Sequence, residues 1–176
     1  MNDIAATVDW PSAIHQQLKS WDVRQVAHVP DAGHKRLIEL CQADNGIAVV
    51  PLTTEEEGVA LLAGAWLGGQ RGALLMQSSG VGNCVNMLSL TRTCRLPLLM
   101  IVTMRGEWGE FNPWQVPMGR NTAAVLELCN VLCFRAERPD EVEPTVNAAA
   151  RMAFEGPQAV AVLLAQRLIG AKSFVK

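Results

Sequence analysis

The sequence predicts an α/β domain with a doubly wound, mostly parallel sheet and helices on both faces. Short apolar segments alternate with helix-like segments along most of the chain, as in sheets whose parallel strands are joined by helices. The run 97–104 is apolar throughout, which is typical of a central strand covered on both faces. A length of 176 residues, without repeat or linker, predicts a single domain over residues 1–176.

Local signals place the elements in order. Pro11 and Pro139 suit the first turn of a helix, and Thr53 and Thr54 offer an N-cap before three glutamates. We expect helices at 10–21, 33–42, 56–67, 83–93, 122–129 and 139–154. We expect strands at 23–29, 48–52, 72–77, 97–104, 131–136 and 159–164. Three segments follow strands and should meet at the carboxyl edge of the sheet, where such folds bind ligands: 30–34, 77–83 and the long 105–120 loop.

Composition and charge exclude several classes of protein. The net charge is -2 and Tyr is absent, so a nucleic-acid surface is not expected. No apolar stretch is long enough to cross a membrane, and the polar start, 1–9, does not resemble a signal peptide. Five irregularly spaced cysteines suggest neither disulfides nor a metal site, although Cys129 and Cys133 lie four apart. We therefore expect a cytoplasmic protein.

The cluster Glu55, Glu56 and Glu57 has two interpretations. Carboxylates in a first helical turn are stabilised by the helix dipole, which is a sufficient reason for acidic residues there. However, the following turns hold only small and apolar residues, so at least one glutamate should face a packed surface. Burial would raise the pKa of that carboxyl group, which would then need a partner to share its proton.

The other chemistry-bearing segments are weaker signals when taken alone. The turn 77–83 is rich in Ser and Gly but matches neither a Walker loop nor a dinucleotide-binding fingerprint. Arg105 and Arg120 could hold an anion with their guanidinium groups, or could be ordinary surface residues. A single histidine such as His34 is more typical of a helix cap or a surface residue than of a catalytic residue. No hydrolase motif in the sequence supports a catalytic role for it.

In combination, these motifs resemble the pyrimidine-binding domain of thiamine-diphosphate-dependent 2-oxoacid decarboxylases. The segments that carry the resemblance are 51–67, 75–86, 104–109 and 115–122, in this order and spacing. They are similar in particular to the alpha subunit of sulfopyruvate decarboxylase and to the N-terminal part of phosphonopyruvate decarboxylase. The resemblance implies release of carbon dioxide and an aldehyde from a 2-oxoacid. A related carboligase or aldehyde-transfer subunit, or a non-catalytic scaffold module, is the alternative.

The resemblance also implies roles for individual residues. The family pattern of Glu, one residue and Gly maps onto Glu56 and Gly58, with Glu55 as an alternative. This glutamate shares a proton with the aminopyrimidine ring of the cofactor. The implied cofactor-binding residues are Glu56, Gln77, Ser79, Gly80, Gly82 and Asn83. The implied substrate contacts are Asp31, His34, Arg105, Gln115 and Arg120. Trp108 and Trp114 would cover either the substrate or a partner.

The chain lacks the Gly-Asp-Gly motif that these enzymes use to bind the diphosphate through a metal. It also ends soon after its last expected strand. The resemblance therefore implies a separate beta-type chain that holds the diphosphate and Mg²⁺, with the cofactor between the two chains. We expect an α2β2 assembly or a multiple of it, and a homodimer when the alpha chain is isolated.

Overall fold

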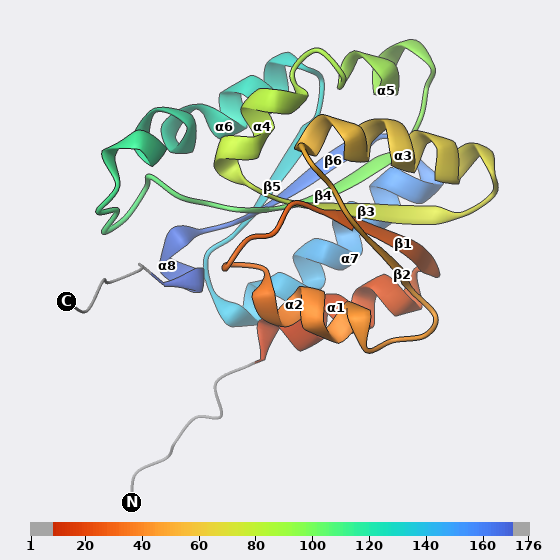
Figure 1. Ribbon diagram of the computed structural model, residues 1–176, viewed down its shortest axis with the longest axis horizontal. Helices are drawn as coiled ribbons and strands as arrows, with labels where there is room; N and C mark the ends of the chain where they lie inside the picture. Colours follow the sequence, from red (N-terminus) through yellow and green to blue (C-terminus); the bar gives the residue numbers. More distant parts are fainter. Residues whose placement is uncertain (1–8, 171–176) are drawn as a thin grey trace, which may run out of the picture.

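A computed structural model describes residues 9–170, in which six parallel strands form one twisted sheet (Figure 1). The strand order is β2-β1-β3-β4-β6-β5. The strands are β1 (Val23–His28), β2 (Ala48–Pro51), β3 (Arg71–Gln77), β4 (Leu98–Thr103), β5 (Leu132–Ala136) and β6 (Ala159–Leu164). All neighbouring strands pair in parallel, which confirms the predicted α/β fold class.

Helices cover both faces of the sheet (Figure 1). One layer contains α1 (Trp10–Ser20), α2 (Lys35–Gln42) and α7 (Pro139–Glu155). The other contains α3 (Glu55–Leu67), α4 (Ser78–Cys84), α5 (Ser89–Thr93) and α6 (Val116–Leu128). Successive residues of a strand point to opposite faces of the sheet, so each central strand contributes side chains to two hydrophobic cores. In β4, Leu99 and Ile101 face α7, whereas Met100 and Val102 lie in the core under α3 and α4.

The structure corrects three local predictions. Residues 78–83 form most of α4 rather than a turn, and the expected helix 83–93 is divided between α4 and α5. The loop after β4 is shorter than predicted, because a 3-10 turn, Pro113–Gln115, leads directly into α6. Pro117 is compatible with the first turn of that helix. A short helix, α8 (Gln166–Ile169), was not predicted.

The chain order creates a crevice at the carboxyl edge of the sheet. From β1 the chain crosses to β2 on one side, and β3 then lies on the other side of β1. Such a change of direction separates the loops that follow neighbouring strands and leaves room for a ligand. The predicted polar N-terminal segment lies, apart from Asp9, outside the described residues, as do residues 171–176. Within the range 9–170, none of the helices combines the length and apolarity needed to cross a membrane.

Candidate functional site

Polar side chains from three neighbouring strands meet at this crevice. Asp31 follows β1, Gln77 ends β3 and Thr103 ends β4. The carboxylate of Asp31 accepts hydrogen bonds from Gln77 Nε2 at 2.9 Å and from Thr103 Oγ1 at 2.6 Å. Burial alone would raise the pKa of Asp31, but the Thr103 bond, the nearby His34 ring and the Gln77 bond together lower it. Asp31 is therefore held ionised by the ends of two other strands.

His34 lies beneath this group and is 0% exposed. Its Nε2 lies 3.0 Å from the carbonyl oxygen of Ile101 and 3.3 Å from that of Met76, while Nδ1 has no hydrogen-bond partner in the described part of the chain. Burial lowers the pKa of the ring, which favours the neutral form with a proton on Nε2. The prediction that His34 contacts substrate directly is not supported by this position, because protein atoms enclose the ring.

Arg105 begins the loop after β4, and its guanidinium is already paired. Its Nε and Nη2 each donate to the carboxylate of Glu110 at 2.6 Å, and both side chains are buried. This side-on pair lowers the pKa of Glu110 to about 2. The sequence predicts that Arg105 faces an anion of the substrate. In the structure, one edge of its guanidinium faces an internal carboxylate instead.

A cavity of about 280 Å³ joins these two groups. Asp31, Thr103 and Arg105 line it, together with Gly33 and the end of α8. A side chain at Gly33 would approach Asp31 and Thr103 to 2.9 Å, so glycine keeps this corner open. The cavity therefore places one carboxylate and one guanidinium, both predicted as substrate contacts, on the same enclosed space.

The start of α3 is joined to α4 through Glu55. Its Oε2 accepts a hydrogen bond from Asn83 Nδ2 at 2.8 Å, and the side chain is buried. A Cβ atom at Gly80 would lie 2.3 Å from Glu55 Oε1, so only glycine permits this approach. Gly80 and Asn83, both predicted to bind a cofactor, thus contact Glu55 within the chain.

Glu56 differs from its neighbour. It is half-buried, and its Oε2 is shielded from solvent without a well-formed hydrogen bond within residues 9–170. The Thr54 hydroxyl holds the pKa of Glu56 below its usual value, with help from a backbone N–H. The pKa of Glu56 therefore does not show the rise that burial of a carboxylate at this position would cause.

The remaining predicted residues are dispersed. Ser79 Oγ donates to Gln77 Oε1 at 3.0 Å, which places both at the start of α4 near Asp31. Gly82 is exposed, and a Cβ there would meet Met118 only at ordinary contact distance. Arg120 lies on α6 rather than in the loop, and lines a separate cavity of about 310 Å³. It is not brought together with Arg105.

Gln115 lies in the 3-10 turn, close to the loop of Arg105. Its Oε1 is buried without a hydrogen bond in the described residues. Gly106 adopts φ +74°, and a Cβ there would lie 2.4 Å from the Gln115 carbonyl oxygen. The backbone of Gln115 is thus packed against the loop after β4, whereas its side-chain oxygen is available for a partner.

Three polar residues of this edge were missed by sequence reasoning: Thr103, Glu110 and Gln166. Each completes a hydrogen-bond network around a predicted residue. The position of Glu110, five residues after Arg105, is a weak signal that could have suggested a local ion pair. No signal in the sequence links Gln166 to this loop, because it lies 56 residues from Glu110.

This fold and edge define a class: a parallel α/β domain in which polar side chains gather at the carboxyl ends of its central strands. Residues 10–112 match the family described as thiamine pyrophosphate enzyme, N-terminal TPP binding domain. The chain belongs to this family, as its resemblance predicted.

Known proteins give the same assignment. The chain is 36% identical over 152 residues to sulfopyruvate decarboxylase subunit alpha of Methanocaldococcus jannaschii, covering 86% of this chain and 90% of the relative. It is 40% identical over 111 residues to phosphonopyruvate decarboxylase of Streptomyces viridochromogenes, covering 62% of this chain and 28% of that protein.

A solved 2-oxoglutarate:ferredoxin oxidoreductase from Magnetococcus marinus aligns with 91% of this chain and 29% of its own, with a TM-score of 0.69. At 11% identity this likeness shows the fold alone.

Proposed function

We propose that this chain is the alpha-type subunit of a thiamine-diphosphate-dependent 2-oxoacid decarboxylase and that Glu56 is its cofactor glutamate. The observation that supports the assignment of Glu56 is its shielded Oε2, which has no well-formed hydrogen bond within residues 9–170, although the Thr54 hydroxyl lowers the pKa of this carboxyl group. Glu55, the alternative, is committed to Asn83 and packs on Gly80. A buried acceptor without a donor is costly, so Glu56 fits a donor supplied from outside the chain.

The cofactor supplies an electron sink that allows the bond to the substrate carboxyl carbon to break. Glu56 would hold a proton between its carboxylate and a ring nitrogen of the aminopyrimidine. Gln77 and Ser79, at the start of α4, and Gly82, later in the same helix, would line one side of the ring. The ionised Asp31 and the Arg105 guanidinium would position the 2-oxoacid in the 280 Å³ cavity. The products would be carbon dioxide and an aldehyde.

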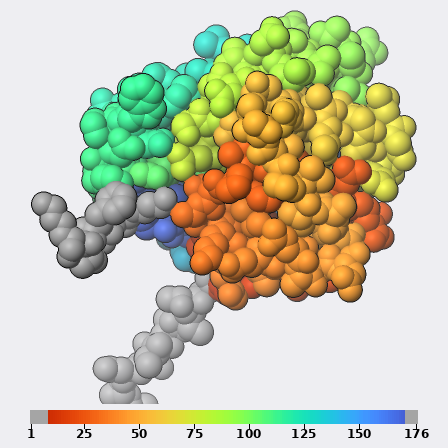
Figure 2. Space-filling view, in the orientation of Figure 1, coloured from red at the N-terminus to blue at the C-terminus, as the bar shows by residue number. Residues whose placement is uncertain are grey.

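We further propose that a beta-type chain completes the site and holds the diphosphate through Mg²⁺. Three relatives that match over most of their length are named as alpha subunits of sulfopyruvate decarboxylase. Among the described residues, no group of three His, Cys, Asp or Glu side chains could hold a metal. The surface of α3, visible in Figure 2, carries no charge after Glu57 and exposes Ala60, Gly64 and Leu67, the last by 77%. Such a surface suits a close-packed subunit contact.

The substrate class is proposed from the relatives: a three-carbon 2-oxoacid with a sulfonate or phosphonate tail. Arg105 and Arg120 do not share a cavity, so they would not clamp one anion together. The aromatic side chains Trp108 and Trp114 are exposed in the isolated chain, Trp114 by 84%. They would face the partner or the mouth of the completed site. Five cysteines without a disulfide fit a cytoplasmic enzyme.

The test is reconstitution. This chain is combined with a candidate chain from the same genome that carries Gly-Asp-Gly, and carbon dioxide release is measured from a panel of 2-oxoacids. We expect Glu56→Gln to lower kcat/KM by at least about 100-fold, as loss of a positioned acid–base group does.

The matched control is Glu55→Gln, whose remaining carbonyl oxygen can still accept from Asn83. It should retain most of the activity. Full activity in Glu56→Gln together with loss in Glu55→Gln would move the role to Glu55. If both variants are fully active, the scaffold alternative is favoured.

A further inference from the structure

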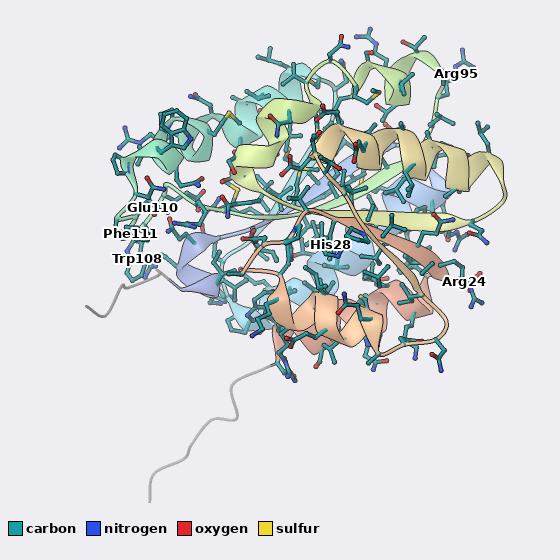
Figure 3. The ribbon with its side chains drawn as sticks, viewed as in Figure 1. Arg24, His28, Arg95, Trp108, Glu110 and Phe111 are labelled. Carbon is teal, nitrogen blue, oxygen red and sulfur yellow. The ribbon has the colours of Figure 1, made fainter. Side chains whose placement is uncertain are left out.

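Gln166 is the first residue of α8, separated from β6 by Ala165 alone, and is 1% exposed. Its side-chain Oε1 accepts hydrogen bonds from the backbone N–H groups of Glu107 and Trp108, both at 2.9 Å. Its Nε2 donates to Glu110 Oε2 at 2.9 Å. One buried amide thus uses both its ends on the loop after β4. Figure 3 shows the labelled Trp108 and Glu110 on this loop, beside α8.

Glu110 links Gln166 to Arg105, because its carboxylate binds both side chains. Besides Gln166 and the two Arg105 nitrogens, the Glu110 carboxylate accepts from the N–H groups of Gly106 at 3.2 Å and Asn112 at 3.0 Å. The carboxylate therefore has one orientation in which all its donors are satisfied. That orientation fixes the plane of the Arg105 guanidinium, because a side-on pair is directional.

The paired edge of Arg105 consists of Nε and Nη2. A guanidinium has five N–H donors, so the Nη1 edge is not used by Glu110. Arg105 also lines the 280 Å³ cavity with Asp31 and Thr103. Which edge of the guanidinium faces a ligand there depends on Glu110, and the orientation of Glu110 depends on Gln166.

We propose that Gln166 is a positioning residue: it holds Glu110 so that the free edge of Arg105 faces the cavity and binds acceptor oxygens of the substrate. The substrate part of this inference rests on the proposed function. The positioning part does not, since it concerns contacts within this chain alone.

Gln166→Glu is the informative variant, because it has nearly the same shape. Its carboxylate can still accept from the N–H groups of Glu107 and Trp108, so the loop keeps its backbone anchor. In its ionised form it cannot donate to Glu110, and it places two carboxylates in contact, which is unfavourable. The matched control is Gln158→Glu, the same chemical change at an exposed position just before β6.

The first readout is the ¹⁵N resonance of the Arg105 Nε–H group in the isolated chain. We expect slow hydrogen exchange of this proton in the wild type and in Gln158→Glu, and exchange at least tenfold faster in Gln166→Glu. Unchanged exchange in a folded Gln166→Glu chain would overturn the positioning role.

The second readout is kinetic, in the reconstituted enzyme. Gln166→Glu should raise KM for the 2-oxoacid at least tenfold, with kcat lowered less than threefold and KM for thiamine diphosphate unchanged. A variant that loses thermal stability but keeps its substrate KM would show that Gln166 is only structural. If the wild-type assembly decarboxylates no 2-oxoacid, both the proposed function and the claim that Arg105 binds substrate are wrong. The exchange measurement would still show whether Gln166 positions Glu110 and Arg105.

Discussion

Glu56, in the first turn of α3 after β2, and Glu110, in the loop after β4, both follow the carboxyl end of a strand but have opposite surroundings. Glu110 is buried, and its two oxygens together accept five hydrogen bonds, two of them from a guanidinium. Glu56 is half-buried, and one of its oxygens has no hydrogen bond within the described residues. The hydrogen bonding of Glu110 is satisfied within residues 9–170, whereas one oxygen of Glu56 has no well-formed hydrogen bond there.

Under the proposed function, the difference separates a carboxylate that positions other residues of the site from one that takes part in the chemistry. When a carboxylate is ion-paired and all its hydrogen-bonding positions are used, the fold fixes both its proton affinity and its orientation. A shielded carboxylate without a donor can still acquire one from a cofactor, and its proton affinity would change on binding. The contrast predicts that replacing Glu110 affects folding, whereas replacing Glu56 affects activity.

The largest effect on stability is expected for Glu110→Met. It leaves the Arg105 guanidinium buried without its partner, which costs about 3–5 kcal/mol. Urea unfolding of the isolated chain, followed by tryptophan fluorescence, measures the change. Glu137→Gln is the control, because Glu137 pairs with Arg135 at the surface and should contribute less than about 1 kcal/mol. Equal losses in both variants would show that the buried pair has no special role.

A smaller effect is expected at the contact between α3 and α4. Gly80→Ala places a Cβ 2.3 Å from Glu55 Oε1, so α4 must shift, at a cost of about 1–3 kcal/mol. Gly64→Ala is the matched control: Gly64 is also helical, but a Cβ there meets no atom within 4 Å. It should stabilise the chain by up to about 1 kcal/mol. Two variants of equal stability would contradict the packing described for Glu55.

The smallest effect is expected for Thr103→Val, which removes the 2.6 Å hydrogen bond to Asp31. The pKa of Asp31 is lowered in the folded chain, so this group stabilises the fold above its unfolded pKa of about 3.9. That contribution is lost as pH falls through the folded pKa. Thr103→Val should raise the folded pKa and cost about 1 kcal/mol at neutral pH. A ¹³C carboxyl titration measures the pKa, and an unchanged value would contradict this network.

Much of the fold could be predicted because it depends on local patterns. The strand 159–164 was predicted with its observed limits, since an apolar run stands between Gly156-Pro157 and the polar Gln166. The error at 78–83 has a physical reason: Ser and Gly favour turns locally, but here the segment is helical and packs against Glu55. The predicted loop 105–120 also contains a helical segment: Gly119 lies in α6, and its lack of a side chain lets the Arg105 carbonyl oxygen approach the helix.

The sequence could indicate which residues belong to the candidate site, but not which partners they bind or how deeply they are buried. The sequence indicated Asp31 and Arg105, but not Thr103, which binds Asp31, or Glu110, which binds Arg105 and is itself held by Gln166. The contacts of Thr103 and Gln166 join distant parts of the chain, which local patterns do not reveal. It also could not show that His34 is enclosed or that Arg120 lies over a different cavity. Burial and pairing depend on how the strands are ordered, which local patterns do not specify.

The most direct test of the central claim, that this chain supplies only half of a cofactor site, is calorimetric titration with thiamine diphosphate and Mg²⁺. The chain is titrated alone and then together with its candidate beta partner. We expect no saturable binding to the isolated chain and saturable binding to the pair. Tight binding by the isolated chain would contradict it.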